Sequence, residues 1–445
     1  MSGFYERASN VLPGGVTAAA RANAALGQPF YVSRADGAYL YDLDGRAFVD
    51  TSTSNGASLL GHGHPRVKEA VRRALDLGIA CMYDGEPQVR LAERLCQQIP
   101  CFEMVRFTTT GTEATHYVVR IARAYTGRPK VLKFVGHFHG FNDDLAFNFP
   151  QAADPVPSPV GEDSRRAGGS VPVRAETAGM PPGAADHVVV VPFNDPPAFE
   201  AALERHGGEL AAVVMEPINY DAGAIAPMPG FLELVRAETT RRGIVLVFDE
   251  ILSGYRTGPS GAQGHYGVTP DLCTLGKAIG GGVPLSVFGG KRELMSVVSP
   301  LGRAVHTGTY NAHMIPVLAA HAFLDAIAED GFWEHLLGLH ERLYSGLRAA
   351  FAAAGLPVRV QGVGARFAFY VGLAPDREVT TYAQAVRFDR RLLERFAREM
   401  HTRGVYVNPA WHHGLSAVHT EALVDRICSA AEESARAVVR EMARA

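Results

Sequence analysis

Residues 245–282 read VLVFDEILSGYRTGPSGAQGHYGVTPDLCTLGKAIGGG and contain two apolar runs, each followed closely by a charged residue. The run VLVF leads directly into Asp249, and the run LCTL leads through one glycine into Lys277. Unbroken apolar runs of this length are typical of central parallel strands in an open α/β sheet. Because ligands bind at the carboxyl ends of such strands, we expect Asp249 and Lys277 to serve the same site.

The chemistry of this pair suggests a cofactor. A partly desolvated lysine forms a Schiff base with a carbonyl cofactor, and an acid placed opposite keeps a pyridine nitrogen protonated. Acids often end strands and Gly-Lys pairs are common in loops, so either residue alone would be ordinary. The ordered pair, with a strand before each member and the glycines 280–282 behind, favours a pyridoxal phosphate site with Lys277 and Asp249 as its catalytic residues.

The elements FDE, SGYR, GAQ, YGV-PDL and LGK-IGGG resemble those of class III pyridoxal-phosphate aminotransferases of fold type I, especially glutamate-1-semialdehyde aminomutase-like proteins. The resemblance implies an α/β fold. It implies a large domain with a mostly parallel mixed sheet flanked by helices, and a smaller α+β domain built from both chain termini. We expect residues 1–60 to contribute to the small domain, 61–315 to form the large cofactor-binding domain, and 316–445 to form the carboxyl-terminal small domain.

Composition excludes several other classes. The 445 residues are 47% hydrophobic and 20% charged, as expected for a globular chain of two or three domains. A net charge of −3 gives no basic surface for nucleic acid or an anionic membrane. The five cysteines are odd in number and lack metal-ligand spacing, which predicts reduced thiols and no metal. There is no apolar run of about 20 residues and no signal-peptide core, so we expect a cytoplasmic protein.

The sequence TTTGTEA at 108–114 precedes an apolar stripe with helical spacing. A small-residue turn that opens a helix offers free N–H groups and a positive dipole end to a phosphate, although a plain threonine N-cap would look the same. The family reads NSGTEA here. The resemblance therefore implies that Thr110, Gly111 and Thr112 bind the cofactor phosphate.

Other residues are assigned to the cofactor by the same resemblance. Phe138 occupies the position of an aromatic residue that stacks on the cofactor ring, with His139 after it; a phenyl ring lacks the hydroxyl of tyrosine, and a core role is the alternative. Ile251 would pack on the back face of the ring. Glu216 belongs to an EP pair that lies near the cofactor in relatives, although a simple strand-end acid is also possible.

A second GT pair, Gly308 and Thr309, matches a family element that reaches the cofactor phosphate of the neighbouring subunit. The resemblance therefore implies a homodimer with shared active sites. A polar loop threonine is the alternative at this position.

The residues expected to contact substrate depart from the aminomutase pattern. Arg21 matches an arginine that approaches the substrate carboxylate, which suits a bidentate guanidinium, but Ala18 replaces the neighbouring serine. Asn55 stands where the family has a tryptophan in the pocket wall. Asp221 replaces an asparagine and could bind a cationic substrate. The loop 408–420 lacks the glutamate that relatives carry there.

Three further expectations concern the remaining chain. Residues 150–185 are rich in Pro, Gly, Ala and Ser, which fits either an active-site lid or a disordered surface insertion. The pattern of 385–401 predicts one helix. His412, His413 and His419 share no helix face with a carboxylate, so we expect surface or pocket-rim roles instead of a metal site.

These observations predict a pyridoxal-phosphate aminotransferase that acts on a small-molecule amine, amino acid, β-amino acid or amino-ketone with a keto acceptor. The departures argue against glutamate-1-semialdehyde as the substrate. An aminomutase (an isomerase), a racemase or epimerase, and a decarboxylase remain alternatives, because they share the same cofactor chemistry. A sensor or scaffold protein is the non-enzyme alternative, against which the presence of Lys277 and Asp249 counts.

Overall fold

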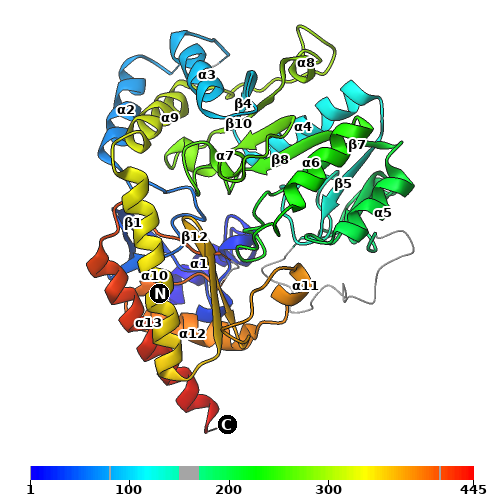
Figure 1. Cartoon of the computed structure of the whole chain (residues 1–445). Coiled ribbons are helices and arrows are strands. Elements are labelled where there is room, and N and C mark those ends of the chain that lie inside the picture. The colour runs from blue at the N-terminus through cyan, green and yellow to red at the C-terminus, as the bar shows by residue number, and fades with distance from the viewer. Residues whose placement is uncertain (1, 80–81, 150–169, 410–411, 445) are drawn as a thin grey trace. The chain divides into compact units, whose positions relative to one another are not determined.

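The computed structural model describes residues 2–79, 82–149, 170–409 and 412–444. The chain divides into two compact units (Figure 1). Unit 1 contains the residues up to His64, Glu334–Glu378 and the residues from Arg387 on; unit 2 contains Pro65–Trp333 and Val379–Val386. The region 316–333, which the sequence assigns to the carboxyl-terminal domain, thus belongs to unit 2. Most of the predicted lid, residues 150–169, lies outside the described residues.

Unit 2 is built on a seven-stranded mixed sheet in the order β4-β10-β9-β8-β7-β5-β6. The strand β10 runs antiparallel to both of its neighbours, and the other described pairings are parallel. The mostly parallel sheet predicted from the sequence is confirmed. The strands are β4 Met104–Thr108, β5 Lys130–Phe134, β6 Val188–Val191, β7 Leu210–Met215, β8 Val245–Glu250, β9 Leu272–Leu275 and β10 Ser286–Gly290.

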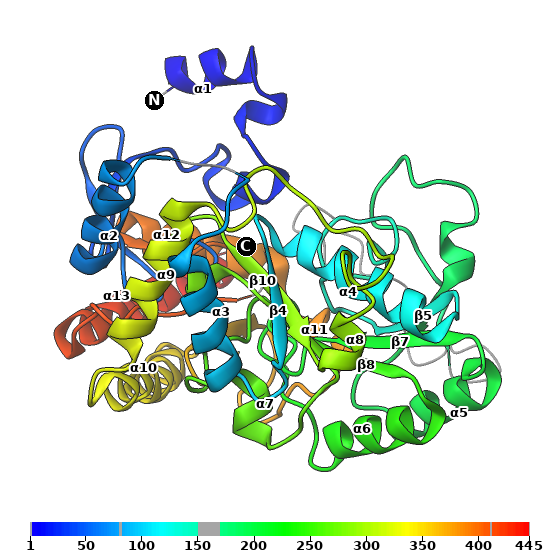
Figure 2. The same ribbon diagram turned by 90° about the horizontal axis from the view of Figure 1, so that it is seen from above.

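Helices cover both faces of this sheet, which explains why β7 and β8 are buried along their whole length. Figure 2 shows α4 on one side of the sheet and α5 and α6 on the other. The helices of unit 2 are α2 Pro65–Asp76, α3 Glu86–Gln98, α4 Gly111–Thr126, α5 Pro196–His206, α6 Phe231–Arg242, α7 Gly261–Tyr266, α8 Arg292–Met295, α9 Met314–Ile327 and α11 Tyr382–Ala385, with 3-10 turns η5 Ala184–His187 and η6 Lys277–Gly280. None of the helices described here or below is long and apolar enough to cross a membrane.

Strand register places the predicted residues at one edge of the sheet. Met215 pairs with Phe248 across β7 and β8, and Asp249 pairs with Thr274 across β8 and β9. Because these strands are parallel, the residues that follow them emerge at the same carboxyl edge.

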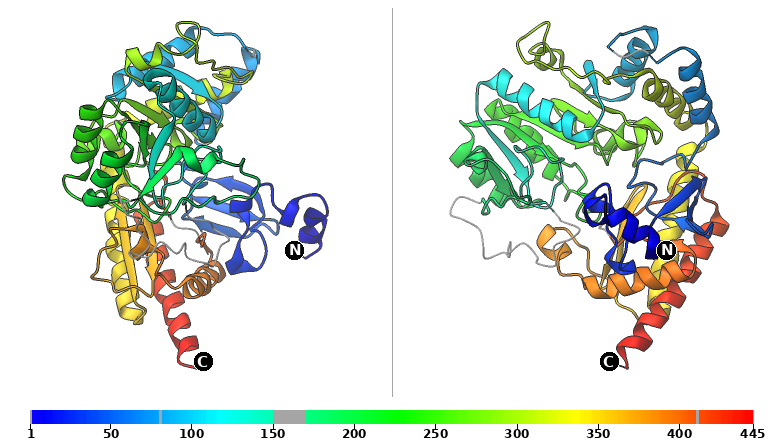
Figure 3. Two further views of the ribbon diagram at one scale, coloured as in Figure 1. Left: turned by 90° about the vertical axis from the view of Figure 1, so that its right-hand side faces the viewer. Right: turned by 180° about the vertical axis from the view of Figure 1, so that it is seen from behind.

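Unit 1 combines two small sheets with long helices. The strand β13 runs parallel to β3 and joins a carboxyl-terminal segment to the amino-terminal meander in the order β1-β2-β3-β13, while β11 and β12 form a hairpin. Figure 3 shows this hairpin beside the yellow, orange and red helices α10, α12 and α13, and the apolar side chains of these elements form the core. The elements are α1 Ser2–Ser9, η1 Pro13–Gly15, η2 Ala19–Arg21, η3 Ala24–Leu26, β1 Val32–Asp36, β2 Tyr39–Asp42, β3 Ala47–Asp50, α10 Phe332–Ala354, β11 Val358–Val363, β12 Arg366–Val371, α12 Arg390–Thr402, β13 Val405–Tyr406 and α13 Glu421–Met442.

The single helix predicted over 385–401 is wrong. The chain forms the short α11, leaves helical structure after Ala385, and begins α12 at Arg390. Asp389 is the N-cap of α12, since its carboxylate accepts a hydrogen bond from the backbone N–H of Leu392 at 3.0 Å. The break also marks the border between the two units, because Val379–Val386 belongs to unit 2 and Arg387 to unit 1.

Candidate active site

Asp249 lies at the carboxyl end of β8 and is held by three hydrogen bonds. The hydroxyl of Thr274 donates to Oδ1 at 2.9 Å, the N–H of Ile251 donates to the same oxygen at 3.1 Å, and Nδ1 of His139 contacts Oδ2 at 2.8 Å. Burial lowers the pKa of His139, so the ring is neutral and donates from Nδ1. The buried Nε2 of His139 has no hydrogen-bond partner among the described residues.

Lys277 follows β9 and opens the turn η6. Its φ of 47° lies in the left-handed region, which costs a residue with a side chain roughly 1–2 kcal/mol. Part of the residue is accessible, yet desolvation of the amine lowers the pKa of Lys277 below its ordinary value. The charges of Asp221, Asp249 and Glu216 oppose this shift, with Asp221 the largest of the three. The protonation of the Lys277 amine therefore depends on the charges of all three acids.

The amino terminus of α4 is capped and leaves backbone N–H groups free. Thr110 is its N-cap: the hydroxyl accepts a hydrogen bond from the N–H of Glu113 at 3.2 Å, while the Glu113 carboxylate accepts from the N–H of Thr110 at 2.8 Å. The Thr110 side chain is thus engaged in capping. The N–H groups of Gly111 and Thr112, in the first turn, have no acceptor within the helix and are suited to a phosphate.

Two glycines beside this turn let the Ile251 side chain pack against the backbone. A Cβ at Gly111 would lie 3.2 Å from side-chain carbons of Ile251, and a Cβ at Gly276 would lie 2.9 Å from Cδ1 of Ile251. The Ile251 side chain therefore packs closely against the phosphate turn and against the residue before Lys277. Larger residues at either glycine would displace it.

Glu216 holds the segment that carries Phe138. Its Oε1 accepts a hydrogen bond from the N–H of Phe138 at 2.9 Å, and its Oε2 accepts from the N–H of Tyr220 at 3.2 Å. Burial and the nearby charge of Asp221 raise the pKa of Glu216 well above its ordinary value. Since both oxygens are used on backbone, Glu216 acts here as a support for the loop.

The Phe138 ring is partly exposed and lies between two edge-on neighbours. Its centroid is 5.2 Å from that of Phe141 and 5.2 Å from that of Phe149. Edge-to-face packing fixes the plane of a ring. The structure thus supplies an oriented, accessible aromatic face at this edge of the sheet, and its stacking on the cofactor stays a prediction.

Sequence reasoning missed the role of Glu250. This buried carboxylate accepts hydrogen bonds from the N–H of Ala262 at 2.6 Å, the side chain of Gln263 at 3.0 Å and the hydroxyl of Ser253 at 3.2 Å. The second acid of FDE therefore anchors the GAQ element at the start of α7, which connects the two sequence elements physically. The only signal in the sequence was their joint presence.

The remaining predicted residues lie in unit 1 or in a loop of unit 2. Arg21 and Asn55 are exposed residues of unit 1; the Arg21 guanidinium donates to the Thr17 hydroxyl, and Asn55 lies within a run of positive-φ residues from Thr53 to Gly56. Gly308 and the exposed Thr309 lie in a loop of unit 2. Their proposed contacts with substrate and phosphate stay predictions.

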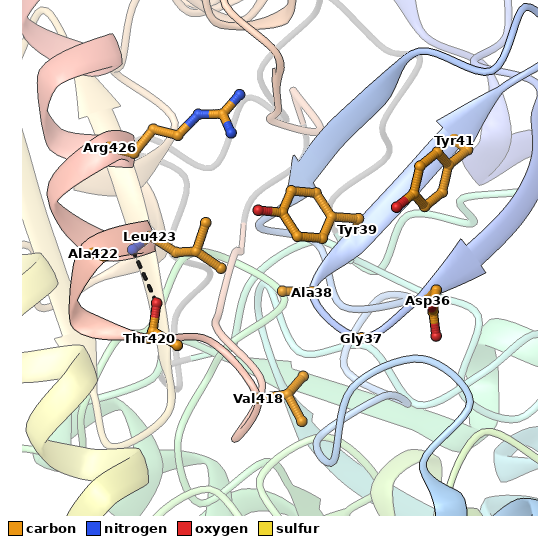
Figure 4. A pocket seen from close by; sticks show the side chains of 10 residues that line it. All are labelled: Asp36, Gly37, Ala38, Tyr39, Tyr41, Val418, Thr420, Ala422, Leu423 and Arg426. Atoms are coloured by element: carbon orange, nitrogen blue, oxygen red, sulfur yellow. Dashed lines mark hydrogen bonds between the residues drawn. The ribbon is translucent and has the colours of Figure 1, made fainter.

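Two of the histidines that could suggest a metal have other partners. His62 contacts the Asp50 carboxylate at 2.8 Å, and His419 contacts the Ser416 hydroxyl at 2.9 Å. His412, His413 and His419 are all buried, so the surface role considered for them is wrong. Within the described ranges no three His, Cys, Asp or Glu residues form a metal-binding group. A surface groove of unit 1, where Tyr39 and Arg426 lie near the start of α13, contains none of the predicted site residues (Figure 4).

The arrangement in unit 2 fits pyridoxal phosphate. It offers a desolvated lysine amine, a fixed carboxylate, a helix terminus with free N–H groups, and two glycines packed closely against Ile251. All of them lie at one edge of the sheet, after a strand or at the start of a helix. The unpartnered Nε2 of His139 adds a buried polar atom able to accept a hydrogen bond near the same carboxylate.

Comparison with known proteins agrees with this geometry. The family model "Aminotransferase class-III" matches residues 20–160 and 167–423. The chain is 36% identical to an omega-transaminase from Sphaerobacter thermophilus, with a TM-score of 0.88 over 98% of this chain and 97% of that one. It is 29% identical to a beta-phenylalanine aminotransferase from Variovorax paradoxus, with a TM-score of 0.83 over 97% and 92% of the two chains.

A glutamate-1-semialdehyde-aminomutase from Pseudomonas aeruginosa PAO1 is 25% identical, with a TM-score of 0.82 over 99% of this chain and 94% of that one. The resemblance drawn from the motifs around Asp249 and Lys277 is thereby confirmed, as are the fold class and the cofactor. The chain belongs to the class III aminotransferases, pyridoxal-phosphate-dependent enzymes of fold type I.

Proposed function

We propose that this enzyme transfers an amino group between an amino acid, β-amino acid or amino-ketone and a keto acceptor, on the scaffold of the glutamate-1-semialdehyde aminomutase-like group. The observation that carries the proposal is the cluster of Lys277, Asp249 and His139 at one sheet edge. Transamination is favoured over the aminomutase reaction because the omega-transaminase is 36% identical, against 25% for the aminomutase. The departures at Asn55 and Asp221 also speak against glutamate-1-semialdehyde.

Each part of the site has a role in holding the cofactor. The N–H groups of Gly111 and Thr112 would bind its phosphate, with the capped Thr110 fixing the turn. Phe138 and Ile251 would contact the two faces of its ring. When bound, pyridoxal phosphate supplies an electron sink for the charge that develops on the substrate carbon.

The protein's own groups then move and hold protons. Nζ of Lys277 takes the proton from the substrate carbon and returns it as general acid; its lowered pKa leaves more neutral amine near neutral pH than an exposed lysine would have. Asp249, fixed by Thr274 and His139, holds a proton at the pyridine nitrogen. Electrostatic interactions of Lys277 with the substrate and of Asp249 with the pyridine nitrogen are stronger in this desolvated setting than in water.

Replacement of Lys277 tests the assignment. We expect Lys277→Ala to lose the visible absorbance of lysine-bound cofactor and all turnover. Lys291→Ala is the matched control, because Lys291 pairs with Asp271 at the start of β9, away from the site. Full activity in the Lys277 variant would refute the assignment, and absence of any cofactor absorbance in the wild type would favour the sensor or scaffold alternative.

A single-turnover screen of amines separates the reactions that share this cofactor. Transamination converts the bound cofactor to its pyridoxamine form. Exchange of the α-hydrogen with deuterated solvent, without that conversion, would indicate a racemase or epimerase. Release of carbon dioxide would indicate a decarboxylase, and a product with the amine moved to a neighbouring carbon would indicate an aminomutase.

We also propose a homodimer with shared sites. Unit 2 exposes large apolar side chains in a first stretch, 75–79 and 82–89, and in a second stretch, 301–310; Gln88 of the first donates to the carbonyl of Ala312, two residues beyond the second, at 3.0 Å. Thr309 lies within the second stretch. Exposed apolar surface of this kind is typical of an association site. Its exposed members are Leu75, Leu77, Ile79, Met82, Tyr83, Val89, Leu301, Val305 and Tyr310.

Subunit mixing tests this arrangement. If Thr309 serves the partner's phosphate, a dimer of one Lys277→Ala chain and one Thr309→Glu chain contains one intact site, and mixing two inactive variants restores activity. If Thr309 serves its own subunit, the mixture stays inactive. A monomer in light scattering at working concentration would contradict the dimer itself.

A further inference from the structure

A second lysine of unit 2, Lys133 in β5, is completely buried. Its Nζ donates hydrogen bonds to the backbone carbonyls of His137 at 2.9 Å and Leu145 at 3.3 Å, and to that of Phe147. An ammonium group has three N–H donors and no acceptor, so these three carbonyls use its full capacity. Buried charges are tolerated only when they are satisfied in this way.

All three carbonyls belong to one loop, which follows β5 and carries Phe138 and His139. The carbonyl of His137 immediately precedes Phe138 in the chain, while the carbonyls of Leu145 and Phe147 lie on the returning half of the loop. The ammonium therefore ties the outgoing and returning halves together. A lysine that stabilised only its own strand would have no reason to have all its acceptors in this loop.

The same ammonium also supports the aromatic packing around Phe138. Nζ of Lys133 lies 5.9 Å from the centroid of the Phe149 ring, within the range of a cation–π interaction. The Phe149 ring in turn packs edge-on against Phe138. Lys133 is thus connected to Phe138 both through the backbone and through a ring.

The charges that face Lys133 are consistent with this role. Burial lowers the pKa of Lys133 to about 7, while the carboxylates of Glu216 and Glu176 oppose the shift. Glu216 is itself bonded to the N–H of Phe138, so a cation and an acid hold the backbone on both sides of this peptide. His137 and His139 are the other titratable groups that interact with the ammonium, and burial lowers the pKa of both.

We propose that Lys133 is a positioning residue of this aminotransferase: its ammonium fixes the loop from His137 to Phe149 so that Phe138 and His139 are held in place for the cofactor. Lys133 does not touch the cofactor in this role and acts through the loop. The proposal rests on the proposed function for the identity of the ligand, but the order of the loop is independent of it.

The test compares Lys133→Met with Asp271→Asn. Methionine keeps the apolar stem and removes all three donors. Asp271 is a buried acid that joins Arg236 and Lys291 at the opposite, amino-terminal end of β9, so its variant measures general destabilisation of unit 2. For each protein we would measure the dissociation constant of pyridoxal phosphate by visible absorbance and the amide hydrogen exchange of residues 135–149.

Both variants are expected to melt at lower temperature. Only Lys133→Met should weaken cofactor binding, by about 10- to 100-fold, because each carbonyl left without its charged donor is costly. Its loop amides should also exchange faster than in the wild type, with and without cofactor. Unchanged affinity together with wild-type exchange in the loop would overturn the proposal, as would equal losses of affinity in the two variants.

A second variant covers the case in which Lys133→Met does not fold. Lys133→Gln keeps a polar side chain with two N–H donors and removes the third donor and the positive charge. Weaker cofactor binding with unchanged binding in Asp271→Asn would support the proposal, and unchanged binding would contradict it. Failure of the proposed function is distinguishable from both results, because it would appear in the wild-type protein as cofactor binding without amino-group transfer in the single-turnover screen.

Discussion

His413 in unit 1 allows a prediction whose magnitude follows from its surroundings. Its ring is fully buried, with centroids 4.9 Å from the Phe369 ring and 5.5 Å from the Phe367 ring. Neither ring nitrogen has a hydrogen-bond partner among the described residues. Burial, with a smaller effect of the Arg366 charge, lowers the pKa of His413 to about 3.

The sign of the pH effect follows from proton binding. The unfolded chain binds a proton at the ordinary pKa of 6.5, whereas the folded chain binds one only near pH 3, so acid favours unfolding between these values. Stability is complete above pH 6.5 and falls as the pH decreases through this window. At pH 5 the loss due to His413 is about 2 kcal/mol relative to pH 8.

We therefore expect His413→Leu to be more stable than the wild type, by about 1–2 kcal/mol at pH 8, because a buried imidazole without partners is replaced by an apolar side chain of similar size. At pH 5 the advantage should grow by about another 2 kcal/mol. Urea unfolding followed by circular dichroism at both pH values measures this, at one protein and cofactor concentration, because ligand binding and association shift apparent stability.

His413→Gln is the matched control. Glutamine keeps a buried polar group and removes the titration, so it should flatten the pH dependence without the gain at pH 8. The reasoning fails if His413→Leu and the wild type lose the same free energy between pH 8 and pH 5.

Two further predictions concern single charges and backbone strain. Asp221→Asn removes the charge that most strongly opposes the lowered pKa of Lys277, so the binding of pyridoxal phosphate to cofactor-free protein should reach its midpoint at lower pH. Asp325→Asn on α9 is the control. An unchanged midpoint would show that the charge of Asp221 does not influence the protonation of Lys277. Ser54 is exposed at a φ of 52° between two other left-handed residues, so Ser54→Gly should raise unfolding free energy by about 0.5–1 kcal/mol, and a lower melting temperature would contradict that.

The sequence predicted that Asp249 and Lys277 lie at the same edge of the sheet, because this position depends only on the parallel strands that precede them. Parallel strands fix which chain ends meet, so two apolar runs followed by Asp249 and Lys277 suffice to place both residues at one edge. The position of His139 on Asp249 could not be derived in this way. It depends on the path of an irregular loop, for which no periodic pattern exists.

The helix predicted over 385–401 failed for a related reason. Its apolar residues continue with helical spacing, but the capping side chain of Asp389 and the assignment of Val379–Val386 to unit 2 depend on contacts made after the chain has folded. An aspartate inside a periodic stretch is compatible with either an exposed helical residue or an N-cap. Only packing decides between them.

Some residues that shape the candidate site do so through hydrogen bonds that the sequence motifs do not predict. Three of them are buried ionisable residues of unit 2: Lys133, Glu216 and Glu250. Each is hydrogen-bonded to backbone near the site: Lys133 donates to three carbonyls of the loop of Phe138, Glu216 accepts from the N–H groups of Phe138 and Tyr220, and Glu250 accepts from the N–H groups of Ala262 and Gln263. Apolar contacts tolerate small shifts, whereas a buried polar group that loses a hydrogen-bond partner is costly, so these groups favour one loop conformation. If the proposed positioning role holds, a substitution at such a position changes the cofactor site without touching cofactor or substrate. Activity lost by changing Lys133 or Glu250 is therefore no evidence of a direct chemical role, and only measurements of loop order distinguish positioning from catalysis.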